Sequence, residues 1–259
     1  MVEIKKIDYD VLKELVTKVG FDPDQLLKDY YITVLLYLLK DIKGIHFKGG
    51  TALQKIFLNY SRLSEDIDFT VTRSILDLKV EIGNAVLKNK VFEKITEDKN
   101  VDGFLRLIVH YQNFSGGDEV VFIDLNKRGK LLLQPESHEI IHFYSETIPK
   151  FEMQTVAQDE MIAEKVAAAI GRNKPRDHFD IYQIIKKKLF INMKLVEKKC
   201  IESNDSFDII KMFNKAQKLK RHWDEDLMPL ITKEITFQEV MTTLAKYFNL
   251  KDEKDKVRK

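Results

Sequence analysis

Residues 46–71, HFKGGTALQKIFLNYSRLSEDIDFTV, constrain the fold of this chain more than any other stretch. A short apolar run ends at Gly49 and Gly50, and apolar residues then recur at helical spacing. This order predicts a strand, a tight turn and a helix. The run DIDFTV that follows alternates acidic and apolar side chains, as does a strand with one buried face. The stretch therefore predicts a helix between two strands, the second with carboxylates on its open face.

The rest of the chain divides into a mixed part and a helical part. Residues 8–43 and 75–94 are predicted as helices, and FLRLIVHYQNF and VVFIDLNK as strands joined by the turn GGDE. From about residue 154 the apolar pattern is almost entirely helical. We therefore expect an α+β fold, in which a core of residues 1–150 contains a small mixed sheet and residues 151–259 form a helical domain.

Composition limits the classes of function. Forty-three Lys and Arg against 41 Asp and Glu give a formal net charge of +2, so the net charge does not indicate a nucleic-acid partner. The single cysteine, Cys200, excludes an intramolecular disulfide and a cysteine-based zinc site. The longest apolar run, YYITVLLYLLK, is too short for a membrane span, so we expect a cytoplasmic protein with no membrane partner.

Asp66 and Asp68 are two residues apart on the predicted strand, so their carboxylates share one face. Two carboxylates placed in this way can hold a hard divalent cation such as Mg²⁺, which prefers oxygen ligands and also binds phosphate. A solvated strand face is the alternative interpretation. Asp124 in VVFIDLN is a candidate third metal ligand, because it ends the polar face of another predicted strand.

Gly49 and Gly50 precede the predicted helix, where backbone without side chains can approach a ligand and helix N–H groups point at anions. Phosphate fits such a place, and a plain tight turn is the alternative. Taken in order, the strand, the double glycine, the helix and the acidic strand predict a phosphate-binding turn beside a metal site.

The motifs KGGTALQK and RLSEDIDF together resemble the nucleotidyltransferase-like toxins of the AbiEii/AbiGii family, which includes the MenT-type toxins of type IV toxin–antitoxin systems. The family pattern is a Gly-Gly-Thr/Ser-x-Leu helix followed by Arg-x-Ser-x-Asp-x-Asp. A second signature places a lysine on one helix and an aspartate on the next. Lys165 and Asp180 in EMIAEKVAAAIGRNKPRDHFDIYQI match it, so the resemblance covers residues 46–71 and 159–185.

The resemblance implies transfer of a nucleoside monophosphate from an NTP to an acceptor hydroxyl, which in some relatives is at the 3′ end of tRNA. A cognate antitoxin is a further expected partner. The implied roles are that Asp66 and Asp68 hold Mg²⁺, that Lys165 neutralises charge as pyrophosphate leaves, and that Asp180 orients Lys165 or helps to deprotonate the attacking hydroxyl. The implied catalytic residues are therefore Asp66, Asp68, Lys165 and Asp180, and the nucleotide-binding residues are Lys48, Gly49, Gly50, Thr51, Arg62 and Ser64.

The residues around the second signature agree with these roles. Lys165 lies at the edge of the predicted buried stripe of its helix, so its stem can run along the core while its ammonium reaches a cleft, expected between the two parts of the chain. A surface lysine is the alternative. We expect Glu164 to point to solvent. Asp180 can pair with Lys165, orient it or accept a proton, and we interpret Asp177 as an ordinary helix-start carboxylate.

Residues 183–222 carry ten Lys and one Arg against four acidic residues. The basic helical surface around Lys186–Arg221 is expected to bind tRNA through salt-sensitive contacts with phosphates, and a solvated helical face is the alternative. A second hypothesis for the whole chain is a catalytically inactive nucleotide- or RNA-binding regulatory module of the same fold. The presence of the four implied catalytic residues argues against it.

Overall fold

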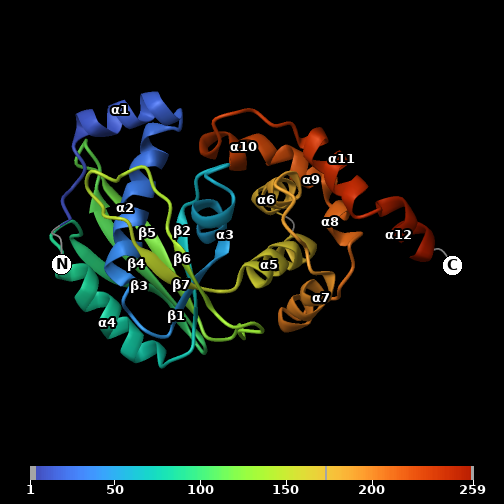
Figure 1. Ribbon diagram of the computed structural model, residues 1–259, viewed down its shortest axis with the longest axis horizontal. Helices are drawn as coiled ribbons and strands as arrows, with labels where there is room; N and C mark the ends of the chain where they lie inside the picture. The colour runs from blue at the N-terminus through green and yellow to red at the C-terminus, as the bar shows by residue number, and fades with distance from the viewer. Residues whose placement is uncertain (1–3, 173, 258–259) are drawn as a thin grey trace. The chain divides into compact units, whose positions relative to one another are not determined.

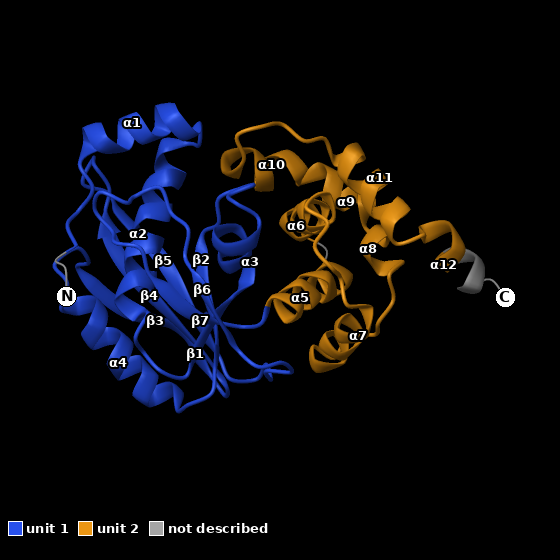
Figure 2. Ribbon diagram, viewed as in Figure 1, with its two compact units in different colours: residues 1–157 blue, residues 158–259 orange. Residues whose placement is uncertain are grey.

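The computed structural model describes residues 4–172 and 174–257. The chain forms two compact units, residues 1–157 and 158–259 (Figure 2). This boundary falls later than the expected residue 150, because the strand β7 (Glu152–Thr155) pairs with other strands of the first unit. No helix among the described residues is both long enough and apolar enough to cross a membrane.

The first unit is built around one mixed sheet. Besides β7, its strands are β1 (Ile45–Lys48), β2 (Asp66–Val71), β3 (Lys94–Val101), β4 (Phe104–Gln112), β5 (Asp118–Asn126) and β6 (Glu136–Glu139). Their order across the sheet is β3-β4-β5-β2-β1-β7-β6. β2 runs parallel to β5 and antiparallel to β1, while β4 and β5 form an antiparallel hairpin. The predicted strands are therefore confirmed, and β2 lies in the middle of the sheet.

The helices of the first unit begin where the sequence indicates. They are α1 (Tyr9–Val19), α2 (Pro23–Leu39), α3 (Gly49–Ala52) and α4 (Ile75–Leu87). α1 and α2 start at Asp8 and Asp22, whose side chains accept hydrogen bonds from backbone amides of the first turn. α2 and α4 contact each other and the sheet (Figure 1), and α2 is buried along most of its length. They cover the face that carries the alternating Leu, Val and Ile residues of β4 and β5.

Helix α3 passes directly into a π-helical turn, Leu53–Phe57. The helix predicted over TALQKIFLNY stops there because Asn59 and Tyr60 both have positive φ, which ends a right-handed helix. The strand–glycine–helix unit is confirmed. Its helical segment is the continuous stretch 49–57, called the double-glycine segment below.

The second unit is helical among its described residues. Its elements are α5 (Gln158–Gly171), α6 (Pro175–Lys186), α7 (Met193–Glu202), α8 (Lys211–Asn214), α9 (Ala216–Arg221), α10 (Trp223–Leu227), a 3₁₀ turn (Met228–Leu230), α11 (Phe237–Tyr247) and α12 (Leu250–Val257). α5 packs against both α6 and α7, and α11 packs on α6. The predicted α+β class, with a sheet in the first part and helices in the second, is confirmed.

Candidate active site

At the double glycine, the backbone lies against side chains of the RLSEDIDF motif. Gly49 has φ +80°, a conformation that glycine adopts at little cost, and a Cβ there would collide with the carboxylate of Asp68. A Cβ at Gly50 would lie 2.9 Å from Nη2 of Arg62 and 3.2 Å from Oγ of Ser64. The chain therefore places both glycines directly beside polar side chains that begin twelve residues later, and a side chain at position 49 or 50 would crowd against them.

Hydrogen bonds within the motif residues fix this turn. The hydroxyl of Thr51 donates to the backbone oxygen of Asp66. Arg62 is almost fully buried, and its Nη1 donates to the carbonyl of Leu63 at 2.7 Å. The backbone N–H of Arg62 donates to Oε1 of Gln54 at 3.2 Å. Thr51 and Arg62, both predicted to bind nucleotide, thus also hold the double-glycine segment against the start of β2.

A row of charged side chains crosses the sheet. Register pairs Lys48 of β1 with Asp68 of β2, Asp68 with Asp124 of β5, and Asp124 with Arg106 of β4. Directly paired residues of neighbouring strands project to the same face, so the four side chains share a face in the order positive, negative, negative, positive. We call these four residues the charged row. Three of its members were predicted as site residues, and Arg106 was not.

Asp66 and Asp68 share the open face of β2 as predicted. Both are half-exposed, whereas Ile67 and Phe69, which point the other way, are fully buried. Two carboxylates on an open face beside side-chain-free backbone fit a hard cation such as Mg²⁺. Within residues 4–172 and 174–257, no three His, Cys, Asp or Glu side chains are grouped as metal ligands, so the fit rests on this pair.

Asp124 lies on the same face, but its carboxylate is already engaged. Nε and Nη2 of Arg106 each donate to one of its oxygens at 2.7 Å. This bidentate bond raises the pKa of Arg106. The guanidinium also lies over the ring of Phe122, 5.0 Å from its centroid. Arg106 therefore engages both oxygens of Asp124, the residue predicted as a third metal ligand.

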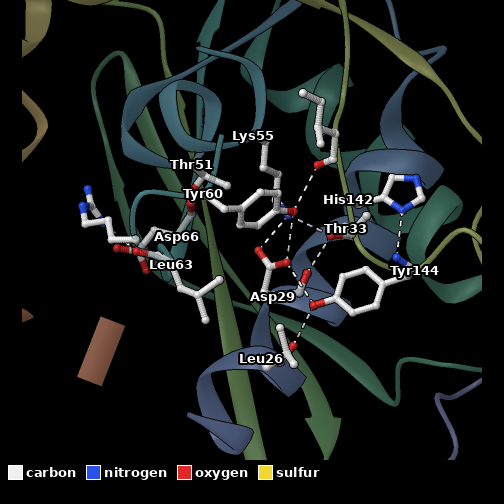
Figure 3. A network of polar contacts seen from close by, with 12 residues as sticks. Leu26, Asp29, Thr33, Thr51, Lys55, Tyr60, Leu63, Asp66, His142 and Tyr144 are labelled. Atoms are coloured by element: carbon white, nitrogen blue, oxygen red, sulfur yellow. Dashed lines mark hydrogen bonds and ion pairs between the residues drawn. The ribbon is translucent and has the colours of Figure 1, made fainter. Parts of the chain in front are cut away.

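A buried polar network, not anticipated from the sequence, anchors the double-glycine segment (Figure 3). Nζ of Lys55 lies 2.7 Å from Oδ1 of Asp29 in α2 and donates to the hydroxyls of Thr33 and Tyr60 at 2.9 and 2.6 Å. The hydroxyls of Tyr60 and Tyr144 donate to Asp29 at 3.2 and 3.0 Å. Burial lowers the pKa of Lys55, and the charge of Asp29 offsets part of that effect. The network fixes the segment that carries both glycines.

In the second unit, Lys165 of α5 is held between two aspartates of α6. Its Nζ lies 3.0 Å from Asp177 and 2.9 Å from Asp180. All three side chains are buried, with 7%, 1% and 0% exposure for Lys165, Asp177 and Asp180. The predicted pairing of Lys165 with Asp180 is present, whereas the contact with Asp177 was not expected.

The interpretation of Asp177 as an ordinary helix-start carboxylate was wrong. Arg172 donates from Nε and Nη2 to its two oxygens at 2.8 Å each, in addition to the contact with Lys165. Burial alone would raise the pKa of Asp177, but Lys165 and Arg172 together hold it well below its usual range. Because α6 begins at Pro175, Asp177 and Asp180 lie one turn apart and can face the same ammonium.

Glu164 also differs from expectation, because it does not point freely to solvent. Its side chain is 22% exposed and lies 3.2 Å from Nζ of Lys199. Lys199 is itself buried and also pairs with Glu160 at 2.6 Å and Glu202 at 3.0 Å. The pairs with Glu160 and Glu164 join α5 to α7, so Lys199 is not part of the basic surface that was counted over residues 183–222.

Asp177→Asn should remove an acid-sensitive part of the stability. Since the folded pKa of Asp177 lies below its ordinary value of 3.8, the ionised carboxylate stabilises the fold fully above that value. The contribution is lost as the pH falls through the lowered folded pKa. We expect the variant to be less stable by about 1–3 kcal/mol at neutral pH and the difference to shrink under acid conditions.

Thermal denaturation of both proteins across an acid-to-neutral pH series measures this difference. Asp224→Asn, at an exposed carboxylate of α10, is the matched control and should follow wild type at every pH. A Tm difference for Asp177→Asn that stays constant over the series would contradict the prediction.

Comparisons with known proteins identify the family of this chain. The family model described as nucleotidyl transferase AbiEii toxin, type IV TA system, matches residues 38–243. The chain belongs to the AbiEii family. The match includes both signatures, so the family predicted from the motifs is confirmed, and with it the assignment to the nucleotidyltransferase toxins. A comparison with curated proteins found no match.

Solved structures share the fold of this AbiEii protein. JHP933 from Helicobacter pylori is 18% identical over 92% of this chain and 97% of its own, with a TM-score of 0.62. The nucleotidyltransferase toxin MenT4 from Mycobacterium tuberculosis is 22% identical over 85% of this chain and 73% of its own, with a TM-score of 0.60. At these identities the likeness establishes the fold.

Proposed function

We propose that this AbiEii protein transfers a nucleoside monophosphate from an NTP to the hydroxyl at the 3′ end of tRNA, in the cytoplasm and under the control of a cognate antitoxin. The observation that carries the proposal is the approach of the backbone at Gly49 and Gly50 to Asp68, Arg62 and Ser64. Amide donors and carboxylates meet there on the open face of one sheet, which suits a metal-bound triphosphate.

The first unit supplies the groups for the nucleotide. Asp66 and Asp68 would hold Mg²⁺ through their carboxylate oxygens. When bound, the ion supplies positive charge to the triphosphate. Backbone N–H groups of Gly49, Gly50 and Thr51 bind phosphate oxygens, and the ammonium of Lys48, at the end of the charged row, adds a second positive charge.

The reaction is an in-line displacement at the α-phosphorus. The acceptor oxygen bonds to phosphorus as the bond from phosphorus to the oxygen of the β-phosphate breaks, pyrophosphate leaves, and the hydroxyl proton passes to water. The family resemblance assigns to Lys165 the neutralisation of the charge that develops on pyrophosphate. Its contacts of 3.0 and 2.9 Å with Asp177 and Asp180 favour an orienting role for both aspartates over proton transfer by Asp180.

Incubation of the purified protein with each α-³²P-labelled NTP, Mg²⁺ and total tRNA tests the proposal. We expect one NTP to label tRNA, and EDTA to abolish the labelling. Periodate oxidation of the tRNA 3′ end before incubation should also prevent it. Label on a protein would contradict the proposal that tRNA is the acceptor. NTP binding without transfer under every condition would favour the inactive regulatory module.

Lys186, Lys187 and Lys188 test whether the basic surface contacts tRNA. All three are exposed at the end of α6. Their joint replacement by serine should weaken tRNA binding and reduce the slope of log Kd against log salt by about 2, because each phosphate contact contributes about 0.7–0.9. NTP binding should not change. Equal salt slopes in the two proteins would assign these lysines to a solvated face.

A further inference from the structure

Phe122 and Arg106 form a flat platform beside the two candidate metal-binding carboxylates. Register pairs Phe122 of β5 with Asp66 of β2, so the ring neighbours that carboxylate on the open face of the sheet. Arg106 covers the ring and is fixed there by its bidentate bond to Asp124. The Arg106 side chain is 33% exposed and that of Asp124 is 12% exposed. The platform is therefore rigid and accessible, and the nucleotide-binding groups do not include it.

The strand order places this platform on one side of the reacting phosphorus. The double-glycine backbone, which holds the phosphates, follows β1, and the carboxylate pair is on β2. β5 and then β4 lie on the opposite side of β2 from β1. In phosphoryl transfer the attacking and leaving oxygens are roughly in line. Since pyrophosphate leaves on the β1 side, the acceptor must approach over β5 and β4.

Resting on the proposed function, we propose that Phe122 and Arg106 form the acceptor subsite and that it binds the 3′-terminal nucleotide of a single-stranded RNA end by stacking with its base. Bases stack on aromatic rings and guanidinium planes. Nε and Nη2 of Arg106 are used by Asp124, and Nη1 lies outside that pair and can donate to a phosphate oxygen. A serine or tyrosine acceptor of a protein would bring no base to this surface.

The residue next to the charged row, on the neighbouring strand β3, also favours RNA as the occupant. Lys99 of β3 is the register partner of Arg106 and is exposed. RNA that leaves the platform toward β3 meets this second cation, which suits its phosphate backbone. Asp98 and Asp66 also act electrostatically on Arg106, so the platform itself carries little net positive charge. Stacking on the layered pair of Arg106 and Phe122 is therefore the main expected source of affinity, with charge supplied by Lys99.

Binding of a 5′-fluorescein RNA of about twelve nucleotides, single-stranded and with a free 3′ end, tests the inference by fluorescence anisotropy in EDTA. Phe122→Ala should weaken binding about tenfold, because stacking on an aromatic side chain is lost. Phe122→Trp should retain it. The matched control is Phe114→Ala, at an exposed phenylalanine of the β4–β5 turn, which should bind as wild type does. NTP affinity, measured separately, should be equal in all four proteins.

Arg106→Lys gives a second measurement, which decides the matter if Phe122→Ala does not fold. It keeps the positive charge but loses the planar fork, so RNA binding should weaken about threefold to fivefold. Equal RNA affinity in wild type, Phe122→Ala and Arg106→Lys would overturn the subsite, even where tRNA labelling shows that the proposed function holds. A wild-type protein that binds no RNA and labels a protein would overturn the proposed acceptor and the subsite together.

Discussion

Asp66→Asn should lower the rate of nucleotide transfer by about a thousandfold or more, because several kcal/mol of transition-state stabilisation depend on the carboxylate pair. The fold should be nearly unaffected. Asp66 is half-exposed, and its contact with the Thr51 hydroxyl uses its backbone oxygen, which asparagine retains. Initial rates with labelled NTP, together with thermal denaturation of the variant, measure both effects.

Glu65→Gln is the matched control for this substitution. It removes one carboxylate at the neighbouring position, just before β2 begins, and it should change the transfer rate by less than about threefold. Wild-type turnover by a folded Asp66→Asn protein would remove the basis for the metal site. A large loss in both variants would indicate a general electrostatic effect rather than a specific ligand.

The largest effect on stability is expected at the buried pair of Asp29 and Lys55. Asp29→Leu leaves the ammonium of Lys55 buried without a countercharge, which destabilises by about 3–5 kcal/mol. Lys55→Met leaves Asp29 buried as an anion and should cost a similar amount. The side chains are only 3% and 1% exposed, so water cannot replace the missing partner. Urea denaturation of the two single variants measures these losses.

The double variant Asp29→Leu/Lys55→Met should recover most of the lost stability. Neither charge then remains, and each tyrosine hydroxyl has a backbone acceptor within reach in place of Asp29. The carbonyl oxygen of Ile141 lies 3.0 Å from the hydroxyl of Tyr60, and that of Leu26 lies 2.9 Å from the hydroxyl of Tyr144. The double-mutant cycle should give a coupling energy of about 2–4 kcal/mol. Losses that simply add would show that the two side chains act independently.

Much of the first unit could be predicted because its signals are local. Glycines before an apolar helix and acids that alternate with Ile67 and Phe69 are set by backbone conformation and by the period of a strand. The pair of Arg106 and Asp124 was also within reach. The turn at Asn113–Gly117 closes the β4–β5 hairpin, and counting outward from it aligns these two residues. The register between β2 and β5, which places Asp68 and Asp124 side by side, has no such turn to count from, because these two strands are distant in the sequence.

The family, the fold class and the shared strand face of Asp66 and Asp68 could be predicted, because the motifs and the hydrophobic periodicity that indicate them lie within single elements. Packing between elements decided which charged side chains are buried. Asp29 and Lys55 meet because α2 packs beside the double-glycine segment, and Asp177 became a partner of Lys165 because α6 packs on α5. The sequence around a charged residue is the same whether its side chain faces water or a buried partner. Only the packing of elements distant along the chain removes the water, and the charge must then be paired.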